Sequence, residues 1–184
     1  MLSMSPLRQT LMFVPLLALA AILVGLPASA FGEDDHGTFR ARFLGVNETP
    51  SISTDASASL NVRINGSGNT ATITYTFRFS GLRAPVTQAH IHFAQSKVAG
   101  GVMVFLCGTA AIPGPAGTPT CVADTTITRT LTAADVVGPA PQGIAAGEMG
   151  RVVQAIRDGA SYGNVHSSMF PSGEARGQLV NTDR

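Results

Sequence analysis

Three histidines stand in segments whose pattern predicts β-strands, and their spacing suits a metal site. His90 and His92 lie two residues apart, so on a strand their side chains point to the same face. His166 shares a face with Asn164 in a later strand-like segment. If the two strands are neighbours, three imidazoles converge, which is a ligand set for copper or zinc. The alternative is a metal-free polar cluster, in which the imidazoles bond to Asn164, Glu174 or backbone groups.

Two cysteines, Cys107 and Cys121, are the only ones in the chain. Residues 108–120 between them are rich in Pro and Gly and predict a loop without regular structure. In an oxidising compartment an even count favours a disulfide, which would restrict this loop. The alternatives are two free thiols or, with less support from the spacing, a metal site.

Other kinds of chemistry find little support in the sequence. It contains neither a G-x-S-x-G nucleophile motif nor a glycine-rich phosphate loop. The formal net charge is +1 and the pI is about 7.9, so the overall field does not favour nucleic acid or anionic lipid. We therefore expect a protein or a small ligand as partner, and copper or zinc as the only cofactors to consider.

The first thirty residues predict a signal peptide. Arg8 precedes the uncharged apolar run 11–26, and Ala28-Ser29-Ala30 supplies small residues at a cleavage site. The alternative is a permanent anchor, although the apolar run is shorter than the ~20 residues of a membrane span. Cleavage would leave a short polar linker, 31–37, and one domain, 38–181, exported to the periplasm or the extracellular space and free of the membrane.

The elements that must position the histidines are predicted to be mainly antiparallel strands. Apolar and polar residues alternate over several segments, and glycine-rich turns separate them. The predicted strands cover 38–46, 56–64, 70–80, 86–93, 102–107, 125–131, 161–167 and 174–180. A capping box at 132–135 and a short helix over 148–158 interrupt them. This order predicts an all-β fold, a sandwich or a partly closed barrel, with one helical insertion.

Three motifs, in order, resemble the CHRD domain first described in chordin. They are Ala89-His90-Ile91-His92-Phe93 with the following 100–106 segment, Tyr162-Gly163-Asn164-Val165-His166-Ser167, and Pro171-Ser172-Gly173-Glu174-Ala175-Arg176-Gly177-Gln178. The sequence departs from the family pattern at Phe93, where glycine is frequent, and at Ala175, where a larger aliphatic residue is usual.

The resemblance implies an antiparallel sandwich of immunoglobulin-like or Cu,Zn superoxide dismutase-like type. It also implies roles for the motif residues Asn164, Gly173, Glu174, Arg176 and Gly177. No enzymatic activity is established for the family, and fold alone transfers no function. Two hypotheses follow: a secreted binding or structural module without catalysis, or a copper- or zinc-binding, redox-active protein centred on the three histidines.

Overall fold

The computed structural model describes residues 36–183 of the chain. The predicted signal peptide, 1–30, and residues 31–35 of the predicted linker, 31–37, lie outside the described residues, whereas His36 and Gly37 of that linker belong to the first strand.

Three long strands form the first part of the sheet: β1 (His36–Leu44), β2 (Ser57–Asn65) and β3 (Thr72–Ser80). Each alternates between buried and outward-facing residues, as the sequence pattern predicts. β1 pairs antiparallel with β2, and β2 with β3 through the predicted hairpin turn. β6 (Ile127–Leu131) continues this part on the outer side of β3.

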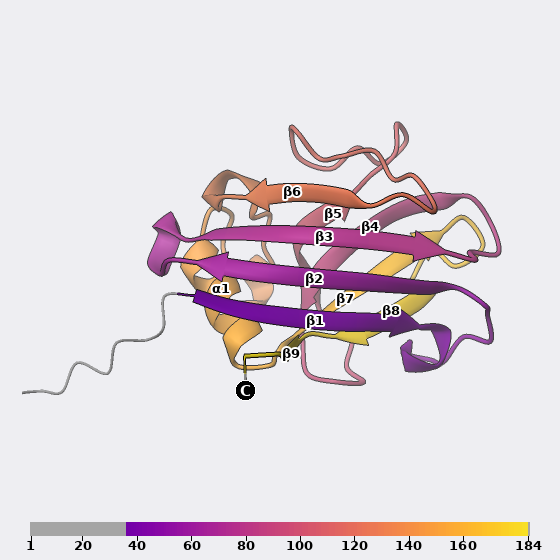
Figure 1. Cartoon of the computed structure of the whole chain (residues 1–184), viewed down its shortest axis with the longest axis horizontal. Helices are drawn as coiled ribbons and strands as arrows, with labels where there is room; N and C mark the ends of the chain where they lie inside the picture. The colour runs from indigo at the N-terminus through magenta and orange to yellow at the C-terminus, as the bar shows by residue number, and fades with distance from the viewer. Residues whose placement is uncertain (1–35, 184) are drawn as a thin grey trace, which may run out of the picture. The chain divides into compact units, whose positions relative to one another are not determined.

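The other strands lie behind these in Figure 1. They are β4 (Val86–Phe93), β5 (Gly101–Cys107), β7 (Ser161–Ser167) and β8 (Ala175–Gln178), with the short β9 (Val180–Asn181) paired to β1. The complete order is β5-β4-β7-β8-β1-β2-β3-β6. The all-β antiparallel prediction is confirmed, and the strands form one continuous, nearly barrel-shaped sheet whose edges are β5 and β6.

The junction between β8 and β1 depends on a glycine. Leu44 of β1 pairs with Arg176 of β8, and the next residue of β8 is Gly177. A Cβ atom at Gly177 would lie only 2.3 Å from the Arg42 carbonyl oxygen. Only glycine therefore lets the two backbones approach closely enough for the sheet to continue across this point.

The core fills the space inside the curled sheet. Aromatic side chains from β1 and β3, among them Phe43 and Phe77, are fully buried with ring centroids 5.7 Å apart. Tyr75 of β3 is also buried, and its hydroxyl donates to the Leu106 carbonyl oxygen of β5 at 2.5 Å. This bond connects the two parts of the sheet and satisfies the one polar atom of the ring.

The helical insertion confirms the predicted helix within one residue at either end. α1 (Met149–Arg157) buries Met149, Val152, Val153, Ala155 and Ile156 and so covers one end of the core. Before it, the short 3₁₀ turn Ala133–Asp135 has the predicted capping box with Thr132. Two more 3₁₀ turns, Gly45–Asn47 and Gly68–Thr70, follow β1 and β2, and a fourth is Ala140–Gln142. No helix in residues 36–183 is both long and apolar enough to cross a bilayer.

The Pro/Gly-rich segment 108–120 forms a loop at the end of β5. The sulfur atoms of Cys107 and Cys121 lie 2.07 Å apart, at disulfide distance. Beside them, the Gly108 amide donates to the Pro119 carbonyl oxygen and the Cys121 amide to the Gly108 carbonyl oxygen. The two ends of the loop are thus held together where it leaves and rejoins the sheet.

Candidate metal centre

The three histidines lie on two neighbouring strands inside the sheet. β4 pairs antiparallel with β7, with His90 opposite Asn164 and His92 opposite Tyr162. His166 stands two residues beyond Asn164 and therefore on the same face. The predicted neighbourhood of the two strands is confirmed.

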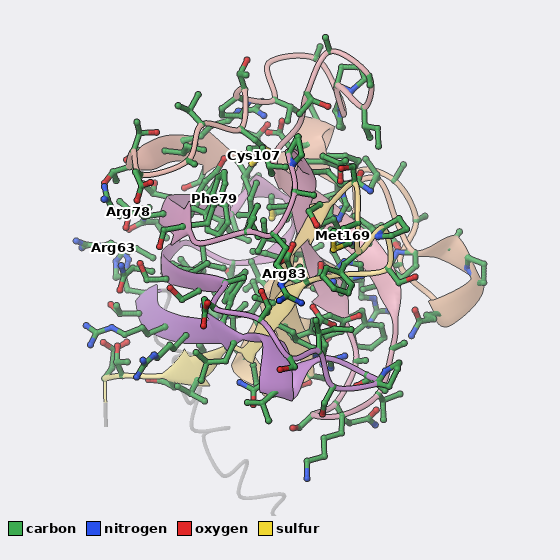
Figure 2. The ribbon with its side chains drawn as sticks, turned by 90° about the vertical axis from the view of Figure 1, so that its right-hand side faces the viewer. Arg63, Arg78, Phe79, Arg83, Cys107 and Met169 are labelled. Carbon is green, nitrogen blue, oxygen red and sulfur yellow. A yellow bond between two sulfur atoms is a disulfide. The ribbon has the colours of Figure 1, made fainter. Side chains whose placement is uncertain are left out.

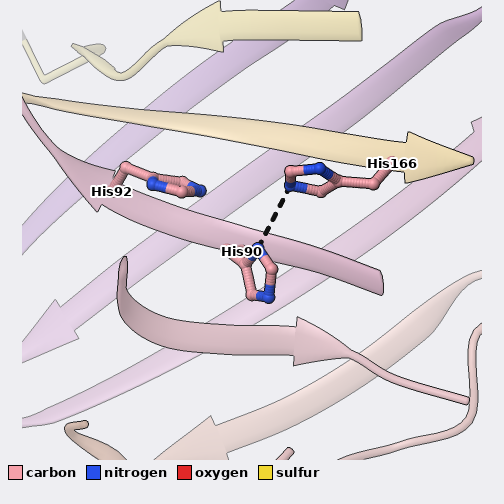
Figure 3. A group of neighbouring side chains, drawn as sticks. All are labelled: His90, His92 and His166. Carbon is pink, nitrogen blue, oxygen red and sulfur yellow. Dashed lines mark hydrogen bonds between the residues drawn. The ribbon is translucent and has the colours of Figure 1, made fainter. Parts of the chain in front are cut away.

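The imidazoles form a compact, buried cluster (Figure 3). His90 is 2% exposed, His92 7% and His166 5%. One ring nitrogen from each lies within 4.8 Å of those of the other two, and the His90 Nδ1 to His166 Nε2 distance is 3.2 Å. Modest side-chain movements would bring these nitrogens to the ~2.0–2.1 Å bond lengths of a shared zinc ion.

Two of the rings are oriented by backbone carbonyl groups. His92 Nδ1 lies 2.9 Å from the Gly100 carbonyl oxygen, and His166 Nδ1 lies 2.9 Å from that of Pro171. A carbonyl oxygen only accepts, so each Nδ1 carries a proton and donates it. In the neutral rings Nε2 is then the bare nitrogen. Metal-bound histidines show this arrangement, in which the second nitrogen donates to a fixed acceptor.

An excess of acceptors meets inside the cluster. His166 Nε2 faces both His90 Nδ1, at 3.2 Å, and the Asn164 amide oxygen, at 2.9 Å. The proton of neutral His166 is on Nδ1, so its Nε2 can only accept. A proton on His90 Nδ1 can satisfy His166 Nε2, but the Asn164 amide oxygen then still faces His166 Nε2, which is another acceptor. Nε2 of His92 is also buried without a hydrogen-bond partner among the described residues, and so is Nε2 of His90, which points away from His166 and His92 in Figure 3. A cation bound here would satisfy several of these atoms at once.

Burial keeps all three imidazoles in the form that binds metal. Desolvation lowers the pKa of His92 to about 4 and that of His90 to about 2, and it lowers the pKa of His166 as well. Repulsion between neighbouring imidazolium charges adds to this effect at His90 and His92. At neutral pH the rings are uncharged, so no proton has to leave before a metal ion binds.

Aromatic rings pack against the cluster on two sides. Phe105 of β5 meets the His90 ring edge-on at a centroid distance of 4.3 Å, and Tyr162 stacks on His92. The Arg176 guanidinium lies over the Tyr162 ring, 3.3 Å from its centroid, and donates to two backbone carbonyl oxygens. These contacts restrict the orientation of His90 and His92.

Glu48 places a buried carboxyl group near Asn164, and the sequence alone did not identify it. Glu48 is 8% exposed, and its buried Oε1 has no hydrogen-bond partner among the described residues. Burial raises the pKa of Glu48 to about 7, against the lowering effect of nearby Arg176. Glu48 follows a 3₁₀ turn, outside any strand, so no period in the sequence could assign it to the cluster.

Gly173 makes room for the Glu48–Asn164 pair. Its φ is +127°, and a Cβ atom would lie 2.6 Å from Glu48 Oε1 and 2.7 Å from Asn164 Nδ2. The sequence identified this glycine only through its motif.

Asn164 and Glu174, the two side chains predicted to bond to the imidazoles, have different outcomes. Asn164 contacts His166, as predicted. The prediction that Glu174 bonds to an imidazole is wrong: its carboxylate accepts from Thr54 Oγ1, the Arg83 backbone amide and Ser167 Oγ. Glu174 is fully buried and connects loops to the end of β7, so its role is structural.

Comparison with known proteins gives one match. The family model described as the CHRD domain matches residues 39–179. No curated protein and no solved structure matches significantly. The matched range contains all three histidines, Asn164, Gly173 and both cysteines.

Proposed function

The chain belongs to the CHRD domain family, and we propose that it is an exported, non-catalytic module that holds a zinc or copper ion between His90, His92 and His166. A non-catalytic role is supported by the burial of all three rings beneath aromatic side chains. A substrate would have little access to an ion at this place.

The metal assignment rests on one observation: His166 Nε2, which accepts hydrogen bonds, lies 2.9 Å from the Asn164 amide oxygen, which also accepts them. These two atoms and His92 Nε2 all belong to groups that accept at neutral pH. Three imidazole nitrogens suit zinc and copper, and a nearby amide oxygen is compatible with either. The described part of the chain brings no thiolate to this place, since both cysteines are paired elsewhere.

A metal-free arrangement is the competing candidate. If the Asn164 amide is turned over, its nitrogen donates to His166 Nε2 and its oxygen faces Glu48. Glu48 must then be protonated to donate in return, and its raised pKa allows that. The cluster would then be a polar network that fixes β4 against β7.

Export is supported by the predicted signal peptide, 1–30, and by the cysteine pair at disulfide distance, which an oxidising compartment favours. N-terminal sequencing of the exported protein should give Phe31 as the first residue. A full-length, membrane-retained chain would contradict export.

The superoxide dismutase-like sandwich implied by the family is supported by the arrangement of the strands in Figure 1, where β6-β3-β2-β1 lie in front of β5-β4-β7-β8.

Metal binding is tested on protein purified from its native compartment. Elemental analysis should find zinc or copper at about one ion per chain. After metal removal, titration with Zn²⁺ and Cu²⁺ should show a single site that His92→Ala weakens by roughly a hundredfold or more. His36→Ala is the matched control, because His36 is exposed at the start of β1, and it should bind like wild type. Equal, weak binding by all three proteins would leave only the polar network.

A further inference from the structure

The outer face of β1, β2 and β3 is cationic, and it contains none of the histidines of the candidate metal centre, which lie on β4 and β7. Arg40 and Arg42 of β1, Arg63 of β2 and Arg78 of β3 all stand at exposed positions. None of the three strands contains Asp or Glu, and most other outward positions carry Ser, Thr or Asn. Figure 2 shows Arg63 and Arg78 extending from the same side of the domain. With a net charge of only +1 for the whole chain, this concentration of arginines is local.

The register of the strands makes a slot between two of these arginines. Arg42 is paired with Ser59, and Ser59 with Arg78. Two strand spacings separate the backbones of the two arginines by roughly 10 Å, with the short serine side chain between them. A hollow of about 560 Å³ lies here, lined also by Arg40, Ser57 and Ser80. Among residues 36–183, no acidic residue lines it.

The arginines are available for a ligand. Arg42 and Arg63 lie in paired strands, but within the described residues their side chains have neither a hydrogen bond nor an ion pair. The Arg40 Nε donates to the Asn61 side chain at 3.1 Å, which leaves its terminal nitrogens free to donate. Arg78 donates to the Asp124 backbone carbonyl oxygen, and its guanidinium lies 3.5 Å from the Asp124 carboxylate. More than half of each of the two side chains is exposed, so the ion pair contributes little.

The cationic positions repeat along the strands. Arg42 and Arg78 lie in one row across the sheet, Arg40 in the next, and Arg63 in the third, where it pairs with Thr38. Successive rows are two residues apart, which is roughly 7 Å. An extended peptide repeats its same-face side chains at the same interval.

We propose that this face binds an extended acidic peptide segment of a partner protein, with one carboxylate in the slot between Arg42 and Arg78. The guanidinium fork matches a carboxylate and can donate two parallel hydrogen bonds to it. The hydroxyl of Ser59 on the slot floor is a further donor. Carboxylates at alternate positions of the peptide would then reach Arg40 and Arg63 in the following rows.

The test uses a fluorescein-labelled peptide of ten alternating Glu and Ser residues, with fluorescence anisotropy at 150 mM salt. The wild-type protein should bind it measurably, and a peptide with Gln in place of Glu should bind at least tenfold more weakly. Arg42→Gln should reduce affinity roughly tenfold, since one lost bidentate contact is of that order. Arg63→Gln should reduce it a fewfold.

Arg151→Gln is the matched control, because it removes the same charge from an exposed position on α1. It should change affinity less than twofold, and circular dichroism should show all variants folded. An equal loss in Arg151→Gln and Arg42→Gln would overturn the site in favour of a general charge effect. Tighter binding of a heparin fragment of equal charge than of the peptide would overturn the peptide assignment.

Discussion

The imidazole of His92 and the phenol ring of Tyr162 lie stacked, with centroids 4.8 Å apart and planes inclined by 8°. They are directly paired across β4 and β7. The Gly100 carbonyl oxygen accepts from His92 Nδ1 at 2.9 Å, and the Gly100 amide donates to the Tyr162 hydroxyl at 3.2 Å. One backbone residue therefore fixes both rings, and the orientation of His92 depends on its neighbour.

Replacing Tyr162 should loosen His92. Tyr162→Leu removes the stacked ring and the surface on which Arg176 rests, and we expect about tenfold weaker zinc binding and about 2–3 kcal/mol lower stability. Tyr162→Phe keeps the ring and loses one hydrogen bond, so it should cost about 1 kcal/mol and leave zinc affinity within about threefold. Competitive zinc titration and urea unfolding measure the two effects. Equal zinc affinities of Tyr162→Leu and wild type would exclude a positioning role for the ring.

Gly173 should tolerate no side chain. Gly173→Ala places a Cβ atom 2.6 Å from Glu48 Oε1 at a φ of +127°, so it should destabilise the domain by about 2–4 kcal/mol. It should also weaken zinc binding, because Asn164 must move away.

Gly143→Ala is the control for this change, since Gly143 also has a positive φ, +88°, but has no atom within 4 Å of the added Cβ. It should cost only about 1 kcal/mol and leave the metal site intact. If the two variants unfold at the same urea concentration, strain at φ rather than crowding of the Glu48–Asn164 pair explains the loss.

The local elements follow from sequence periodicity, whereas the site depends on pairings that periodicity does not contain. Alternation predicts β1 to β3 to within two residues at each end, because each strand has one face in the core and one outside. The pairing of β4 with β7 brings together His90 and His166, which are 76 residues apart in the sequence. The sequence predicts the histidine cluster only on the condition that these two strands are neighbours. Glu48 follows a 3₁₀ turn, where the sequence has no regular alternation of apolar and polar residues. Only the folding of the whole domain brings Glu48 close to Asn164.

Closure of the 108–120 loop should account for a substantial part of the stability. Replacing both cysteines by alanine in Cys107→Ala/Cys121→Ala frees a loop of this length in the unfolded state, which should cost about 3 kcal/mol. Urea unfolding of wild type with and without dithiothreitol should show a comparable loss, while the double variant should not respond to the reductant. A wild type that is insensitive to dithiothreitol and reacts fully with thiol reagents in its native state would contradict the bond.

Glu48 should make the metal-free domain less stable as the pH rises from about 4.5 to about 7. Burial raises the pKa of its carboxyl from 4.5 to about 7, so between these values the folded state holds a proton that the unfolded state has released. Folding is then favoured by low pH, and this contribution is fully present below about pH 4.5 and is lost as pH rises through 7. The buried histidines have the opposite effect, since their lowered pKa values penalise folding in acid.

A difference between wild type and Glu48→Gln separates the two effects, because the histidines are common to both proteins. The two should be equally stable, within about 0.5 kcal/mol, at pH 5. At pH 8 Glu48→Gln should be more stable by about 1–2 kcal/mol, less than the full shift implies because residual solvent screens the charge of the carboxylate. Urea unfolding in EDTA at both pH values measures this, with Asp158→Asn as the control for an exposed carboxylate. A difference between the two proteins that is independent of pH, or that favours wild type at pH 8, would show that Glu48 is charged without penalty in the folded state.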